Sequence, residues 1–167
     1  MLLLGLTAMV LGQTGPVVVR RKDPITDQAA IVAAWEANGS AIAVGCTPAT
    51  NTIRVIYMAE RHYFGHTGLL TSAWGLTYRF DESEPVSQDW LHDDHTAEMS
   101  GSSRIAPFID KLATSKRLVI RAKENFGRGD SFDAIFDLGD ALPALKEVLR
   151  ECRTNKIVGK LTVKFGL

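Results

Sequence analysis

The sequence predicts an α+β domain in which a mainly antiparallel β-sheet is covered by two α-helices and closed by one disulfide. Most of the 167-residue chain alternates apolar and polar residues with a period of two, as strands with one buried face do. Two segments instead repeat apolar residues at helical spacing. The only two cysteines, Cys46 and Cys152, occupy apolar positions of one such strand and one such helix.

The size and charge of the chain limit what it can be. Its length fits one domain, which we place at residues 16–167, and its 46% hydrophobic residues supply a core. Lys plus Arg number 19 and equal Asp plus Glu, so the formal net charge is zero. Nucleic-acid binding relies on a basic surface, so we expect no nucleic-acid partner. We also expect no cofactor. A neutral chain does not oppose association with a partner or with itself.

Residues 1–15 form a signal-like apolar segment. The run MLLLGLTAMVLG at 1–12 carries no charge and is too short for a stable membrane span, which needs about 20 residues. We expect export to a periplasmic or secreted location, with removal of the segment between residues 12 and 16. A buried first strand or helix is the alternative interpretation.

The first half of the domain predicts a series of hairpins. A short strand follows Pro16 and ends at a turn at Asp23-Pro24. The apolar run 29–37 fits helix or strand, but the Asn38-Gly39 hairpin signal after it favours two strands, 29–37 and 41–46. A further strand covers 53–57, where Ile53, Val55 and Tyr57 share one face.

The second half predicts three more strands, at 74–80, 118–122 and 132–138, each with alternating buried and polar positions. The stretches 60–72 and 81–104 contain no clear periodicity and are predicted to be loops. The apolar residues of 105–112 and 145–152 recur at i, i+3, i+4 and i+7, which predicts helices behind Ser102 or Ser103 and behind Asp140 as N-caps. Residues 156–167 alternate again and are predicted to form a closing strand.

The cysteines are predicted to pair. Cys46 and Cys152 each point toward the core by separate periodicity arguments, and a helix that covers a sheet brings such positions together. An export-like N-terminus favours the disulfide, because oxidising compartments sustain disulfides. Two buried free thiols are the alternative.

Enzyme or metal chemistry is the competing hypothesis. The four histidines are spaced as His62-x-x-x-His66 and His92-x-x-His95, and such spacings can bring imidazoles to one zinc ion. The first pair lacks the Glu of an HExxH metallohydrolase motif, and the second lies in a polar stretch. No nucleophile elbow or phosphate-binding glycine loop occurs. We therefore expect a non-enzyme with exposed loop histidines.

A set of arginines indicates a binding surface instead. Arg54, Arg79 and Arg121 have the parity opposite to the core on three separate strands. If these strands are neighbours, their guanidiniums can recognise a carboxylate or a phosphate. Ordinary cross-strand Arg–Asp pairing is the alternative. Trp90 is added as a surface recognition candidate.

The order of these segments resembles VasI-type periplasmic proteins, which are associated with bacterial type VI secretion. The resemblance covers most of residues 23–152. It departs where Ala122-Lys123 replace the proline that usually follows R-L-V-I-R. The matching pieces are D-P-I-T-D at 23–27, A-V-G-C at 43–46, N-T-I-R-V-I-Y at 51–57, L-T-Y-R-F-D at 76–81, D-W at 89–90, F-I-D-K-L at 108–112, R-L-V-I-R at 117–121, A-I-F-D-L-G at 134–139 and A-L…L…C at 144–152.

The resemblance implies an exported, non-enzymatic protein. We therefore expect a binding or assembly accessory of the bacterial envelope whose partner is a protein or another envelope component. Its oligomeric state is left open.

Overall fold

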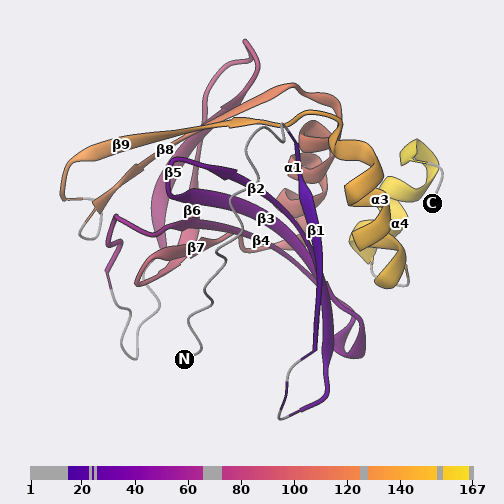
Figure 1. Ribbon diagram of the computed structural model, residues 1–167. Coiled ribbons are helices and arrows are strands. Elements are labelled where there is room, and N and C mark those ends of the chain that lie inside the picture. The colour runs from indigo at the N-terminus through magenta and orange to yellow at the C-terminus, as the bar shows by residue number, and fades with distance from the viewer. Residues whose placement is uncertain are drawn as a thin grey trace.

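The computed structural model describes residues 15–22, 24, 26–65, 73–124, 128–153 and 156–165. Figure 1 shows a strongly curved sheet with the helices gathered on one side of it. The predicted signal-like segment and the predicted turn at Asp23-Pro24 lie largely outside the described residues. Within the described part of the chain, every helix falls short of the length and apolar character needed to cross a membrane.

Within the described residues the sheet has nine strands in the order β1-β2-β3-β4-β7-β6-β5-β8-β9, and all neighbouring strands pair in the antiparallel direction. This confirms the predicted fold class of a mainly antiparallel sheet with covering helices and one disulfide. The strands are β1 Val17–Lys22, β2 Ala29–Ala37, β3 Ser40–Thr47, β4 Thr52–Ala59, β5 Ala73–Phe80, β6 Val86–Asp93, β7 Thr96–Glu98, β8 Arg117–Lys123 and β9 Ser131–Asp137.

Strands β1 to β4 follow one another as a meander, as the hairpin signals predict. Asn38 and Gly39 both have positive φ, 50° and 78°, which is the conformation that a two-residue hairpin turn requires. A short 3-10 helix, Pro48–Thr50, joins β3 to β4. The inward positions of this meander alternate strictly with outward ones, so one face is buried and the other faces outward.

The predicted loop at 81–104 is wrong, because it contains β6 and β7. β6 contains three apolar or aromatic residues; Val86 is separated from the other two by polar residues, and Trp90 and Leu91 are adjacent and therefore have opposite parity. The inner positions of the strand are completed by Gln88 and His92, which are polar residues that hide the alternation. Sequence periodicity fails where polar side chains are buried.

The helices are α1 Ser102–Thr114, α3 Ala141–Glu151 and α4 Lys156–Phe165. The N-cap of α3 is Asp140, as predicted, whereas the N-cap of α1 is Gly101 and not the predicted Ser102 or Ser103. Helix α4 contradicts the predicted closing strand. Ile157, Leu161 and Phe165 are four residues apart, a spacing that fits the period of a strand as well as that of a helix. Val158 is buried beside them, as expected for a helix and not for a strand.

The core lies inside the curve of the sheet. Strands β2 and β9 approach each other across it, and the Trp35 Nε1 of β2 donates a hydrogen bond of 3.1 Å to the Leu138 carbonyl just after β9. The rings of Tyr57 and Phe136 meet edge to face, with centroids 6.4 Å apart. The two ends of the sheet therefore bury a common interior.

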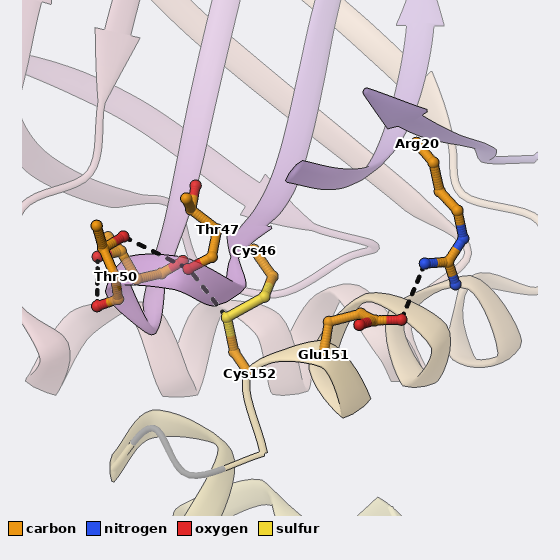
Figure 2. Close-up of a disulfide and its surroundings, with 7 residues drawn as sticks. Arg20, Cys46, Thr47, Thr50, Glu151 and Cys152 are labelled. Atoms are coloured by element: carbon orange, nitrogen blue, oxygen red, sulfur yellow. Dashed lines mark hydrogen bonds and ion pairs between the residues drawn. A yellow bond between two sulfur atoms is a disulfide. The ribbon is translucent and has the colours of Figure 1, made fainter. Parts of the chain in front are cut away.

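The predicted disulfide is present. Cys46 on β3 and Cys152 at the end of α3 are joined by an S–S bond of 2.03 Å, and each residue is only 1% exposed. Figure 2 shows the bond beside the ion pair between Arg20 of β1 and Glu151 of α3. The covalent link and the ion pair both hold α3 against the first strands of the sheet.

Candidate binding surface

Two of the three predicted arginines lie together on the outer face of the sheet. Arg79 belongs to β5 and Arg121 to the adjacent β8. In the register of these strands, Thr77 lies opposite Arg121 and Arg79 lies opposite Val119. The prediction that separate strands bring outward arginines together is therefore correct for this pair.

Arg54 is not part of that group. It lies on β4, and β7 and β6 separate β4 from β5 in the sheet order. Its Nε is 3.6 Å from the Glu98 carboxylate on the neighbouring strand β7. Arg54 thus forms an ordinary cross-strand ion pair with Glu98 on another part of the sheet.

A third arginine, Arg117, completes the group. It lies on β8 with the same outward parity as Val119 and Arg121 and faces Asp137 across β8 and β9. Arg117 is not among the predicted site residues, although the alternation in R-L-V-I-R gives both of its arginines the same face. Together with Val119 and Ile135, the residues Arg79, Arg117 and Arg121 are called the arginine surface below.

Arg121 already has a partner. Its Nε and Nη2 donate to the two carboxylate oxygens of Asp133 on β9, each at 2.7 Å. The hydrogen bonds from Arg121 hold the pKa of Asp133 below its ordinary value. Because both side chains are substantially exposed to water, the pair contributes little to stability. Its effect is to fix the guanidinium in place.

Arg79 and Arg117 differ from Arg121. Among the residues that the structure describes, neither side chain has a hydrogen bond or an ion pair. Both border an open hollow of about 360 Å³ on the outer face. Apolar side chains lie between the arginines, and one of them, Ile135, is 48% exposed. The full lining is Thr77, Tyr78, Arg79, Pro85, Arg117, Val119, Arg121, Asp133 and Ile135.

Trp90 is not a surface residue, so this prediction is wrong. It lies on the inner side of β6 and is 0% exposed. Its ring packs against Tyr78, at a centroid distance of 6.4 Å, and against Phe108 of α1, at 5.9 Å. The predicted loop around Trp90 suggested exposure, and the strand in its place turns the side chain inward.

The histidines do not converge. His62 stacks on Phe132 with ring centroids 3.6 Å apart, and its Nδ1 lies 2.6 Å from the Glu124 carboxylate. His95 is exposed, and its Nδ1 lies 2.9 Å from the His62 carbonyl. His66 lies outside the described residues. Within the described ranges, no three His, Cys, Asp or Glu side chains are grouped so that they could hold a metal ion.

His92 contradicts the expectation of exposed loop histidines. It lies on the inner side of β6, is 4% exposed and packs against Phe64, with ring centroids 5.0 Å apart. Burial lowers its pKa from 6.5 to about 4, although Asp89 opposes the shift. His92 is therefore a neutral core residue near neutral pH.

No family model, curated protein or solved structure matches the chain. The resemblance to VasI-type proteins stays a prediction, and the arginine surface is the structural feature that bears on function.

Proposed function

We propose that the protein is a non-enzymatic binding or assembly accessory of the bacterial envelope, and that its arginine surface binds an acidic segment of a partner protein. The observation that carries the proposal is that Arg79 and Arg117, within the described chain, have no partner of their own. Arginine donates in a planar fork that matches carboxylate and phosphate groups. Two available guanidiniums on one face are thus suited to capture acidic groups.

The residues between the arginines favour a peptide over an isolated anion. Val119 and Ile135 form the row that contains Arg79, and Ile135 is 48% exposed. A segment that alternates acidic and apolar side chains can pair with the guanidiniums and cover these two residues at once. Burial of apolar surface adds affinity that a free phosphate cannot obtain.

The disulfide supports the location. Cys46–Cys152 is buried in the core, and structural disulfides are typical of proteins outside the reducing cytoplasm. A periplasmic or secreted accessory is consistent with it. We also propose a role in type VI secretion, which is supported by the sequence resemblance. The proposal further includes residues 1–15 as a signal-like segment for export.

A peptide titration tests the proposal. The probe is a fluorescent peptide that alternates glutamate with leucine, and binding is measured by anisotropy. We expect the Arg79→Ala/Arg117→Ala double variant to bind about tenfold more weakly, because hydrogen bonds to charged groups contribute about 1.5–3 kcal/mol before screening by water. Arg54→Ala is the matched control, since it removes an outward arginine from another part of the same face.

Two further arms decide what is recognised. A peptide with lysine in place of glutamate should not bind, and pyrophosphate should bind more weakly than the acidic peptide. Thermal melting should be nearly unchanged in the double variant, because exposed arginines without partners contribute little to stability. Equal peptide binding by the wild type and the double variant would remove the arginine surface as the site.

A further inference from the structure

The outer face of β1 to β4 differs from the arginine surface because it is made of small apolar side chains. Antiparallel register places Val19, Val32 and Gly45 in one row, which ends at Arg54 on β4. The next row contains Val17, Ala34 and Ala43 and continues to Ile56. The residues of this apolar face are Val17, Val19, Ala30, Val32, Ala34, Ala41, Ala43, Gly45, Ile56 and Met58.

These residues are open to contact. Val17 is 46% exposed and Met58 38% exposed, and the alanines between them are partly exposed. Helix α3 packs on the opposite side of the same strands, through Cys46 and Arg20. Short side chains give the face low relief, so that a second surface can approach it closely. A Cβ on Gly45 would lie 3.5 Å from the Val32 side chain, which is an ordinary van der Waals contact.

Charges lie at the two ends of the apolar face. Arg21 lies on β1 at one end of the apolar face, opposite Ala30 of β2. Glu36 lies at the other end, opposite Ala41. In the described part of the chain, neither Arg21 nor Glu36 has an ion pair. Glu60 and Arg61 also border the Glu36 end, and the Arg61 side chain lies against Gly39.

We propose that the apolar face binds a second copy of this chain. In this dimer the two-fold axis lies between the apolar faces of the two copies and runs perpendicular to the strands. It therefore places one end of the apolar face over the opposite end of the same face in the other copy. Glu36 of each copy then lies over the Arg21 end of the other. Sheets pack face to face about 10 Å apart with strands about 30° from parallel, and long Arg and Glu side chains span that gap. Such a contact is isologous and closed.

The same features disfavour a lipid surface as the occupant. Alanine, valine and glycine side chains do not reach far beyond the sheet, and the apolar face contains no aromatic residue. The acidic side chains at the border, Glu36, Glu60 and Glu98, are matched by the basic side chains Arg21, Arg54 and Arg61, so the border offers no net positive charge to anionic headgroups. The zero net charge of the chain leaves little repulsion between two copies.

Sedimentation velocity of the purified full chain, between about 1 and 100 μM, tests the contact. The wild type should form a dimer, and Ala43→Glu should weaken it at least a hundredfold, because a charge would be buried at the centre of the interface without a partner. Ile135→Glu is the matched control, since it adds the same charge to an exposed position on the arginine surface. Melting curves establish that both variants fold.

Charge reversal tests the orientation. Glu36→Arg should weaken the dimer about tenfold, and adding Arg21→Glu in the same chain should restore it, because each copy then presents the reversed pair to the other. A wild type that stays monomeric at 100 μM would overturn the proposal, as would an Ala43→Glu variant that dimerises normally. A photo-crosslinker at position 43 that attaches to residues 1–14 of its own chain, or to lipid vesicles, would identify a different occupant and overturn it too.

Discussion

The two halves of the sheet are fixed to their helices in different ways. Strands β1 to β3 are held against α3 by polar and covalent links. Cys46 is bonded to Cys152, and Arg20 donates to Glu151 at 2.9 Å and to Glu147 at 3.1 Å. The inner side chains here are mostly aliphatic.

Strands β5 and β6 are held against α1 by aromatic packing. Phe108 of α1 is 2% exposed and lies at the centre of a group of rings. Its centroid is 5.2 Å from Tyr78, 5.2 Å from Phe80 and 5.9 Å from Trp90. Each buried ring removes about 150–250 Å² from water, and edge-to-face pairs add to that gain.

The two kinds of attachment stabilise the protein through different states of the chain. A disulfide stabilises mainly by restricting the unfolded chain, whereas aromatic packing stabilises the folded one. Loss of either should lower global stability by a similar amount. The local consequences should differ, because only one of the two helices loses its attachment in each case.

The largest effect is expected from removal of the disulfide. Cys46 and Cys152 are separated by 106 residues, and in the chain-entropy model a loop of this length stabilises by about 4–5 kcal/mol. The Cys46→Ala/Cys152→Ala variant should lose most of that amount in urea unfolding. Amide exchange should accelerate first in α3 and β3, while β5 and β6 stay protected.

A matched control for this variant is Arg20→Ala, which removes the two exposed ion pairs of the same attachment and should change the stability far less than loss of the disulfide. Uniform exchange across both halves in the cysteine variant would contradict the idea of separate attachments.

Phe108→Ala should have the next largest effect, about 3–5 kcal/mol, because it leaves a cavity among the rings of the second half. Here exchange should accelerate in α1, β5 and β6 rather than in α3. Val148→Ala is the comparison on α3, since Val148 is buried and lies one helical turn before Cys152, which is bonded to β3. If the two cavity variants expose the same amides, the halves behave as a single unit.

The first half was the easier one to predict from sequence. Its strands alternate strictly, its turn is the Asn38-Gly39 pair, and its cysteine lies on the apolar parity. Each local preference agrees with the final fold, so β2, β3, β4 and the disulfide were all correct.

The second half was harder because it buries polar groups. His92 and Gln88 occupy inward positions of β6. Because strands are predicted from apolar residues at inward positions, these polar residues made the segment look like a loop. The error at Trp90 follows directly from this, since its exposure was inferred from the loop. The arginine surface was only partly predicted, because sequence parity assigns a face to each arginine but not the strand order that separates Arg54 from Arg79.

Protonation of His92 is expected to have the smallest effect on stability and to distinguish the two halves of the sheet most clearly. Its pKa falls from 6.5 to about 4 on folding, so the unfolded chain takes up a proton first as the pH drops. Stability should be unaffected above pH 6.5, fall between pH 6.5 and 4, and lose about 3 kcal/mol in total from this group.

The variant His92→Leu should remove that part of the acid sensitivity, because leucine fills a similar space and cannot be protonated. Urea unfolding at pH 7.5 and pH 4.5 measures the difference, and exposed His95→Gln is the control. Amide exchange in the wild type at pH 4.5 should accelerate around β6 before β3, where no histidine is buried among the described residues. An unchanged pH slope in His92→Leu would place the acid-sensitive group elsewhere.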